Sequence, residues 1–192
     1  MGTMAVHQVP LPMRPLFLRY TLAFLLMGSM NSCRAEDVAD DIARHLKATH
    51  LLKIAHYIQW PAPAFEDPAT PITIGVIGAE PLVEELERIS PAHEIDKRRV
   101  VVKRLTVNDK TAKVHILYIG RRSGAIQGWL TQAERKPLLS VCDATHQLAH
   151  TCAVKFLLNE DRLRFDISLP AAERSGIKIT APLLTVARQV DK

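Results

Sequence analysis

Apolar residues recur at helical spacing at the start of the folded region. Between residues 38 and 59 they stand mostly three or four positions apart, which places them on one face of a helix. Asp37 can cap the first turn, because its carboxylate can accept hydrogen bonds from the free N–H groups there. Pro61 disfavours the helical conformation at the residue before it. The pattern therefore predicts one helix from about Val38 to Gln59.

Further along the chain, short apolar runs alternate with helical segments. Helices are predicted over residues 81–89, over residues 123–130 with Ser123 as the N-cap, and over residues 171–175. The apolar runs predict six strands, at residues 72–78, 99–105, 114–120, 138–142, 153–158 and 163–169. The first strand contains Gly75-x-x-Gly78, which we interpret as a tight exit from the strand.

The order of these elements predicts an α/β fold. Nearly continuous apolar strands are typical of a sheet that is buried on both faces. The β-α-β-β-α-β order favours a single domain with a mixed sheet of about five to six strands, covered by helices on both faces. The last two strands flank the polar turn Asn159-Glu160-Asp161-Arg162, so a C-terminal β-hairpin is expected.

The first 35 residues have the pattern of an export signal. Arg14 and Arg19 give a positively charged segment, and no acidic residue precedes Glu36. Residues 20–30 form an apolar run of the length expected for a signal peptide, whereas a membrane span needs about 20 apolar residues. The sequence therefore predicts that the folded part of the chain is exported.

Two processing routes fit the end of this segment. Small residues favour cleavage after Ala35, which makes residues 1–35 a signal peptide and residues 36–192 the folded domain. Ser32-Cys33 also fits the end of a lipoprotein cleavage site, although less well. That route would leave Cys33 lipidated and the domain tethered to a membrane.

Export also changes the charge balance. The chain carries 25 Lys and Arg against 20 Asp and Glu, a net charge of +5. Arg14, Arg19 and Arg34 leave with the signal peptide and no acidic residue does, so 22 basic residues face 20 acidic ones and the net charge falls to +2. This balance does not support a nucleic-acid-binding surface, so nucleic acid is not an expected partner.

Removal of the signal peptide leaves two cysteines, Cys142 and Cys152. An even number in an oxidising compartment favours a disulfide, which would close a loop of about ten residues and contribute roughly 3 kcal/mol. His146 and His150 lie between them, and the four residues form a set that could bind zinc tetrahedrally. An exported cysteine pair more often oxidises, so the disulfide is preferred and the metal site is the alternative.

A small polar pocket is a further candidate site. Lys53 and His56 lie three positions apart on the predicted first helix. Asp166 and Lys178 come from the C-terminal half, and convergence of the four would create a site for an anionic or zwitterionic ligand. The sequence contains no G-x-S-x-G, H-E-x-x-H, P-loop or complete G-x-G-x-x-G pattern, so nothing in these motifs supports an enzyme, and no cofactor is expected.

Four blocks of the sequence carry a family resemblance. They are KATHLLKIAHYIQWP at residues 47–61, ITIGVIG at 72–78, VHILYIG at 114–120 and VKFLLNEDRLRFDISLPAAERSGIKITAPLLTVAR at 154–188. Their order and spacing, over nearly all of the predicted domain, resemble the YfiR-like family of periplasmic proteins.

The resemblance implies an α/β domain in the periplasm, without catalytic residues, and often a homodimer. Such proteins restrain an inner-membrane diguanylate cyclase by binding its periplasmic sensor region, and so lower cyclic-di-GMP output. The sequence departs from the family pattern at Val114, where members often carry a cysteine, and at Thr151-Cys152, where Gly-Gly is common. Lys53 and His56 stand where asparagine and a basic residue are common, which affects any ligand site carried over from the family.

The function expected from the sequence is that of an exported, non-enzymatic regulator. It would bind the periplasmic region of an inner-membrane sensor protein, a diguanylate cyclase or a histidine kinase, and hold it inactive. Reduction of Cys142–Cys152 is expected to loosen the region between the fourth and fifth strands and weaken this binding. The alternative is a periplasmic sensor of a small ligand or metal that uses the polar pocket or the Cys/His set.

Overall fold

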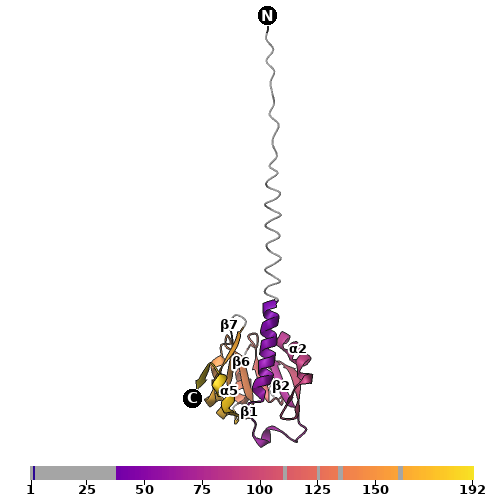
Figure 1. The fold of residues 1–192 in the computed structure, drawn as a ribbon, viewed down its shortest axis with the longest axis vertical. Coiled ribbons are helices and arrows are strands. Elements are labelled where there is room, and N and C mark those ends of the chain that lie inside the picture. Colours follow the sequence, from indigo (N-terminus) through magenta and orange to yellow (C-terminus); the bar gives the residue numbers. More distant parts are fainter. Residues whose placement is uncertain (1, 3–37, 110–111, 125, 134–135, 160–161) are drawn as a thin grey trace. The chain divides into compact units, whose positions relative to one another are not determined.

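The structure is a computed structural model that describes Gly2 and residues 38–109, 112–124, 126–133, 136–159 and 162–192 (Figure 1). Contacts divide the chain into residues 1–39 and residues 40–192, and the second unit contains every described strand. The predicted signal peptide, its cleavage site, Cys33 and the predicted cap Asp37 lie outside the described residues. None of the helices that the structure describes has the length and apolar character needed to cross a membrane.

The main sheet contains eight strands among the described residues. They are β2 (Ile72–Ile77), β3 (Glu94–Ile95), β4 (Arg98–Leu105), β5 (Ile116–Ile119), β6 (Leu139–Asp143), β7 (Val154–Asn159), β8 (Arg162–Ser168) and β10 (Gln189–Asp191). Their order in the sheet is β10-β8-β7-β6-β5-β2-β4-β3. The strands from β7 to β4 in this order are parallel, β10 is parallel to β8, and the β7–β8 and β3–β4 pairs are antiparallel. The long parallel part requires crossover connections, which place helices on the faces.

The predicted α/β class, with a mixed sheet covered on both faces, is confirmed. All six predicted strands are present, and β7 and β8 form the C-terminal hairpin, with Asn159 opposite Arg162. The turn residues Glu160 and Asp161 lie outside the described residues. The expected count of about five to six strands is too low, because β3 and β10 extend the sheet at its two edges. A strand of two or three residues is too short to show an alternating pattern in the sequence.

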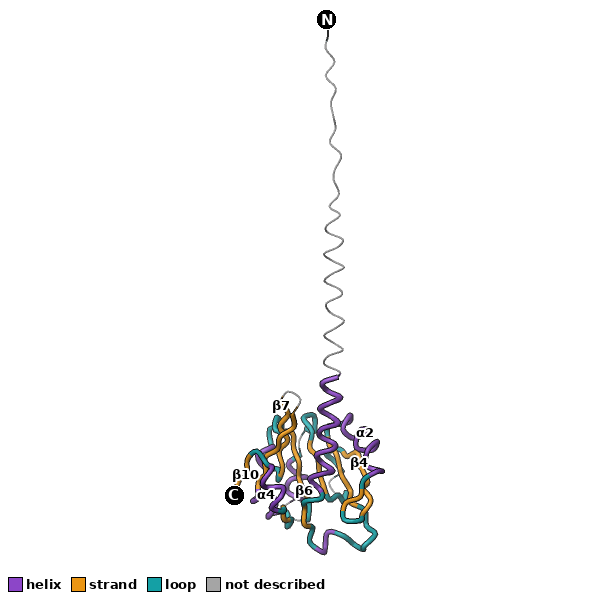
Figure 2. The backbone as a smooth tube through the Cα atoms, in the orientation of Figure 1, coloured by secondary structure: helices purple, strands orange, loops and turns teal. Residues whose placement is uncertain are grey.

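Helices pack over the strands of the sheet (Figure 2). Buried apolar side chains form two cores, one on each face of the sheet. The covering elements are an N-terminal helix (residues 38–55), α2 (Glu80–Ile89), α3 (Gln127–Ala133), α4 (Leu169–Arg174) and α5 (Ala181–Val186), with 3₁₀ turns η1 (Ala62–Ala64), η2 (Ser90–Ala92) and η3 (Ala149–Thr151). Apolar residues of the N-terminal helix, α2, α4 and α5 belong to the first core, whereas those of α3 and η3 belong to the second. The side chains of β5 alternate between the two cores: Ile116 and Tyr118 belong to the first core, and Leu117 and Ile119 to the second.

The N-terminal helix is shorter than its apolar pattern predicts. It ends at residue 55, and the chain then forms a two-residue strand, β1 (Ile58–Gln59). This strand pairs antiparallel with β9 (Lys178–Ile179), which the sequence pattern also missed. Ile58 still contributes to the first core, so its apolar character extends the helical stripe although its backbone pairs with another strand.

Ser123 does not cap a helix as predicted. The helix α3 begins at Gln127, and the N–H groups of Trp129 and Leu130 bond to the carbonyl of Ile126. The hydroxyl of Ser123 lies instead 2.9 Å from Nε2 of His146. A serine hydroxyl can satisfy either a helix end or a distant side chain, and the sequence does not distinguish the two.

Two glycines shape the point where β2 and β5 end. Gly78 has a φ of +68°, and a Cβ there would lie 2.4 Å from the backbone nitrogen of Ser123. A Cβ at Gly120 would lie 2.4 Å from the carbonyl oxygen of Gly78. The two strand exits can therefore pack backbone against backbone only because both residues lack a side chain. This agrees with the interpretation of Gly75-x-x-Gly78 as a tight strand exit.

Candidate functional site

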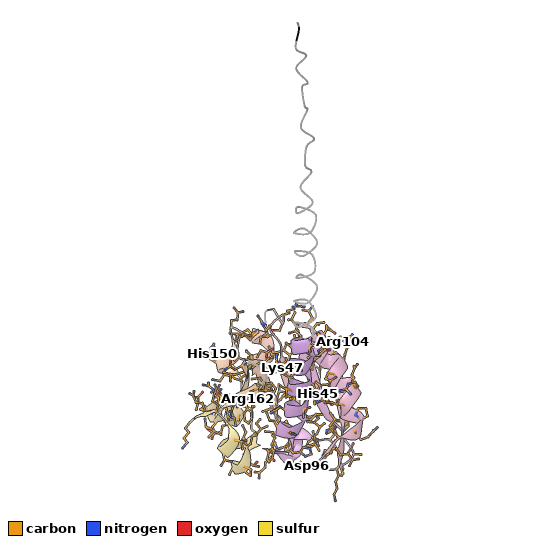
Figure 3. All side chains as sticks on the ribbon, turned by 45° about the horizontal axis from the view of Figure 1, so that its top comes forward. His45, Lys47, Asp96, Arg104, His150 and Arg162 are labelled. Atoms are coloured by element: carbon orange, nitrogen blue, oxygen red, sulfur yellow. A yellow bond between two sulfur atoms is a disulfide. The ribbon has the colours of Figure 1, made fainter. Side chains whose placement is uncertain are left out.

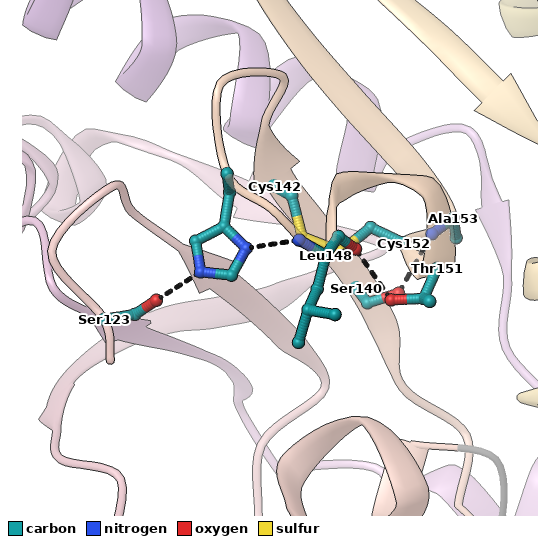
Figure 4. Close-up of a disulfide and its surroundings, with 8 residues drawn as sticks. Ser123, Ser140, Cys142, Leu148, Thr151, Cys152 and Ala153 are labelled. Carbon is teal, nitrogen blue, oxygen red and sulfur yellow. Dashed lines mark hydrogen bonds between the residues drawn. A yellow bond between two sulfur atoms is a disulfide. The ribbon is translucent and has the colours of Figure 1, made fainter. Parts of the chain in front are cut away.

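A disulfide joins Cys142 in β6 to Cys152 at the end of η3, as the cysteine count favours (Figure 4). The two Cα atoms are 6.1 Å apart, which is within the usual range for such a bond. Both side chains are fully buried in the second core. The disulfide therefore closes the ten-residue connection between the parallel strands β6 and β7, and it is shielded from solvent.

The alternative zinc set is not assembled around this bond. Both sulfur atoms belong to the disulfide, so neither is a thiolate ligand. His146 is buried, and its Nδ1 accepts the N–H of Leu148, so its Nε2 carries a proton toward Ser123. His150 is exposed. Within the described part of the chain, no group of three His, Cys, Asp or Glu side chains is arranged to hold a metal ion.

The structure does not bring the four residues of the expected polar pocket together. Lys53 is exposed near the end of the N-terminal helix, and His56 is exposed in the turn that follows it. Lys178 is exposed in β9, opposite Gln59. Asp166 is buried in β8, and since neighbouring residues of a strand point to opposite faces, it points away from the helix that Phe165 contacts.

Asp166 instead forms an ion pair inside the C-terminal part of the fold. Arg188 donates from Nε to one carboxylate oxygen at 2.7 Å and from a terminal nitrogen to the other. Lys155, opposite Asp166 in β7, lies 3.9 Å away and also 3.6 Å from Asp191. The hydrogen bond and charge of Asp166 raise the pKa of Arg188. A buried carboxylate with a bidentate guanidinium is a structural pair that fixes β10 beside β8.

A groove of about 500 Å³ lies between the N-terminal helix, β8 and α5; we call it the helix–β8 groove. Two of its apolar side chains are unusually exposed, Tyr57 at 40% and Val186 at 63%. The rest of its apolar lining comprises Leu46, Ile54, Leu163, Phe165 and Leu183. Its basic lining comprises Lys53, His50, Arg162 and Arg164, and no carboxylate of a described residue lines it (Figure 3 labels Arg162).

The groove combines three properties that favour a peptide ligand. Its basic groups attract an acidic partner, and its exposed apolar groups supply area that can be buried on binding. The third property is an open strand edge, because β10 pairs only with residues 166–168 of β8 and leaves residues 162–164 without a described strand on that side. An extended segment can add to such an edge through backbone hydrogen bonds. The arrangement therefore suits an acidic, extended chain.

Sequence reasoning located one lining residue of this groove, Lys53, and missed the others. Arg162 and Arg164 alternate with Leu163 and Phe165, which predicts the arginine side chains on the opposite face of the strand and gives no signal that they border the groove. The sequence also gives no signal that α5 borders the groove, since the position of α5 depends on the folding of the whole C-terminal segment back onto the helix.

Comparison with protein families found a match to the YfiR/HmsC-like family over residues 44–188. A comparison with curated proteins gave no match. The matched region includes nearly all of the sheet, the disulfide and the helix–β8 groove. It covers well over half of the sequence, and the chain belongs to the YfiR/HmsC-like family.

Proposed function

We propose that this protein is an exported, non-enzymatic regulator that binds the periplasmic region of an inner-membrane diguanylate cyclase and restrains it. The observation that carries the proposal is the family match over residues 44–188, because members of this family are known as periplasmic regulators of diguanylate cyclases. Restraint of the cyclase would lower cyclic-di-GMP. A histidine kinase with a similar periplasmic region is the other partner that the sequence allows.

The helix–β8 groove is the surface that we assign to the partner. Its unpaired strand edge, exposed apolar groups and basic lining suit an acidic, extended segment of the cyclase's periplasmic region. Binding by such a segment would require no catalytic group in the regulator. The folded domain would hold the partner in its inactive state by binding that state more tightly than the active one.

The test is capture of the partner from solubilised inner membrane, together with cyclic-di-GMP measurement in a deletion strain. Deletion is expected to raise cyclic-di-GMP, and the wild-type chain to restore it and capture a diguanylate cyclase. The variant Arg162→Glu/Arg164→Glu should restore neither, because it reverses the charge of the groove. Arg99→Glu, at an exposed position of β4 outside the groove, is the matched control. Unchanged cyclic-di-GMP on deletion would refute the proposal, and capture of a histidine kinase would redirect it.

The disulfide gives this regulation a redox input. Asp143 follows Cys142 in β6 and binds Lys47 of the N-terminal helix at 2.7 Å, and the same helix contributes Lys53 to the groove. Reduction would loosen the β6–β7 connection and, through this ion pair, the helix that borders the groove. Cys142→Ser/Cys152→Ser is therefore expected to bind the partner more weakly than wild type. Equal affinity and equal stability of the two proteins would remove the redox input and leave partner binding itself untouched.

A further inference from the structure

A second cavity lies at the carboxyl ends of the parallel strands. It has a volume of about 760 Å³ and is bordered by the N-terminal helix, the turn after β2, the residues after β5 and the end of β6. We call it the switch-point crevice. The residues on which its chemistry depends are Lys47, Tyr118, Arg121, Arg122 and Asp143.

The position of this crevice follows from the topology of the sheet. From β2 the chain crosses through α2, on the first face, to β4 on one side. From the neighbouring strand β5 it crosses through α3, on the second face, to β6 on the other side. Two adjacent parallel strands whose connections diverge in this way leave a crevice at their carboxyl ends, which is where open α/β sheets bind ligands. The helix–β8 groove lies elsewhere, between the other end of the helix and the C-terminal strands.

Tyr118 supplies the polar group at the base of the crevice. Its side chain is fully buried, and its hydroxyl has no hydrogen-bond partner of normal geometry within the described residues, although the carboxylate of Asp143 is close. Burial, followed by the charge of Asp143 and the approach of its carboxylate to the hydroxyl, raises the pKa of Tyr118 well above its usual value. The phenol therefore keeps its proton at neutral pH and is a donor. Buried donors normally have a partner, and an acceptor atom of a ligand would supply one here.

The charges around the crevice leave two arginines and one carboxylate, Asp40, without an ion-pair partner among the described residues. Its lining also contains the carboxylates Asp40, Glu80 and Asp143 and the cation Arg44. Asp143 binds Lys47, and Glu80 binds Arg104 outside the crevice at 2.6 Å (Figure 3 labels Lys47 and Arg104). Arg44 pairs with Asp41. Arg121 and Arg122 are exposed at the rim, and neither has a carboxylate partner among the described residues.

We propose that the switch-point crevice binds a small organic oxyanion, a carboxylate or a phosphate monoester, between Arg121 and Arg122 at the rim and the hydroxyl of Tyr118 at the base. Arginine recognises both kinds of oxyanion, because its planar donors match two oxygens at once. The incomplete glycine pattern of the β2 turn and the carboxylate of Glu80 argue against a dinucleotide. The bound anion would also attract Lys47, in competition with the carboxylate of Asp143, and so reach the N-terminal helix. This ligand site is independent of the proposed partner.

The test uses calorimetry on the processed chain with inorganic phosphate and with succinate, at low ionic strength. We expect saturable binding of at least one anion, and the one that binds distinguishes a phosphate ligand from a carboxylate. Arg121→Gln/Arg122→Gln and Tyr118→Phe should each weaken that binding by about tenfold or more. Arg99→Gln, which removes a positive charge far along the surface of β4, should keep wild-type affinity.

Thermal unfolding separates ligand recognition from a structural role of Tyr118. Without anion, Tyr118→Phe should unfold at the wild-type temperature or above it, because the lost hydroxyl has no hydrogen-bond partner of normal geometry among the described residues. With anion, wild type should gain thermal stability and Tyr118→Phe should gain much less. The proposal is overturned if neither anion gives saturable heat, or if the double arginine variant binds as wild type does. Partner capture is a separate measurement, so neither the presence nor the absence of anion binding decides whether the proposed function is correct.

Discussion

The imidazole of His115 ties the proline-rich segment after β1 to the main sheet. Its Nδ1 accepts the N–H of Thr73 at 3.0 Å, and its Nε2 lies 3.0 Å from the carbonyl of Ala64, to which it must donate. The ring also stacks on Phe65 with centroids 4.8 Å apart, and Arg98 lies over the same phenyl ring at 3.8 Å. Both nitrogens are therefore used only in the neutral tautomer protonated at Nε2.

This arrangement predicts a loss of stability in mild acid. Burial, together with the charges of Arg98 and Lys103, lowers the pKa of His115 below its ordinary value of 6.5, and the bond to Ala64 opposes this only in part. The unfolded chain then binds the proton at higher pH than the folded one. His115 therefore stabilises the fold fully above about pH 6.5, and this stabilisation is lost as pH falls toward the lower folded-state pKa.

The measurement is the free energy of unfolding of wild type and His115→Gln between pH 7.5 and pH 5, about the span of the histidine titration. The difference between them should shrink as pH falls, because glutamine does not titrate. His150→Gln, at an exposed position, should follow wild type. A difference that stays constant with pH would contradict this prediction, because it would show that His115 has the same pKa in the folded and the unfolded chain.

The connection from β6 to β7 is the element whose stability depends most on a single covalent bond. A ten-residue loop closed by a disulfide contributes roughly 3 kcal/mol in the chain-entropy model. Cys142→Ser/Cys152→Ser should therefore lower the unfolding temperature by about 6–12 °C for a domain of this size. Wild type measured in strong reductant should unfold near the temperature of the variant, and reductant should leave the variant unchanged. An equal unfolding temperature for oxidised wild type and variant would contradict this prediction.

The hairpin between β3 and β4 offers a stabilising change. Ile95 pairs with Arg98, and the two residues between them, Asp96 and Lys97, both have positive φ, at 51° and 62°. Such turns favour Asn-Gly or Asp-Gly, because glycine adopts positive φ without a steric penalty. Lys97→Gly should raise the free energy of unfolding by about 0.5 kcal/mol. The change removes the steric penalty of positive φ at a residue with a Cβ, and this gain exceeds the extra backbone entropy that glycine loses on folding. Lys97→Ala is the control and should give no gain, whereas a loss with glycine would contradict the turn assignment.

At this scale the sequence predicted elements well where they are long and apolar. The six strands from β2 to β8 other than β3 have continuous or alternating apolar runs, and all were found. The elements β1, β3, β9 and β10 have two or three residues each, too few to show a pattern. The strands β1, β9 and β10 also pair with partners far away in the sequence, whereas β3 pairs with the adjacent β4. The predicted first helix extended too far, through Ile58, because the sequence pattern does not distinguish a buried strand residue from a buried helix residue.

For the whole molecule, functional features carried by the local sequence could be predicted, and features assembled from distant segments could not. The cysteine count favoured the disulfide, and the order of four blocks indicated the family. Neither cavity could be predicted, because each gathers side chains from the N-terminal helix and from segments up to about 140 residues later in the chain. The position of Asp166 could not be predicted for a related reason: Asp166 and Phe165 are neighbours in the sequence but face opposite sides of the sheet.

Partner binding through the helix–β8 groove should depend on salt. Lys53, Arg162 and Arg164 are exposed, so their attraction for an acidic segment is screened as ionic strength rises. The Kd for the isolated periplasmic region of the cyclase should therefore increase with sodium chloride concentration, and the increase should be smaller for Arg162→Gln/Arg164→Gln. Surface-immobilised binding assays over a salt series measure both. A Kd independent of salt would assign the affinity to Tyr57, Val186 and their apolar neighbours instead.

The contact between Gly78 and Gly120 has a consequence for comparing members of this family. Each glycine leaves room for the backbone of the other strand exit, so a side chain at one position displaces the turn that the other position fits. We expect the two positions to covary. A homologue with a larger residue at one position should also have a different residue at the other, or a longer turn at one of the two strand exits. Since both turns border the switch-point crevice, paired departures of this kind would mark the members in which its entrance has been rebuilt.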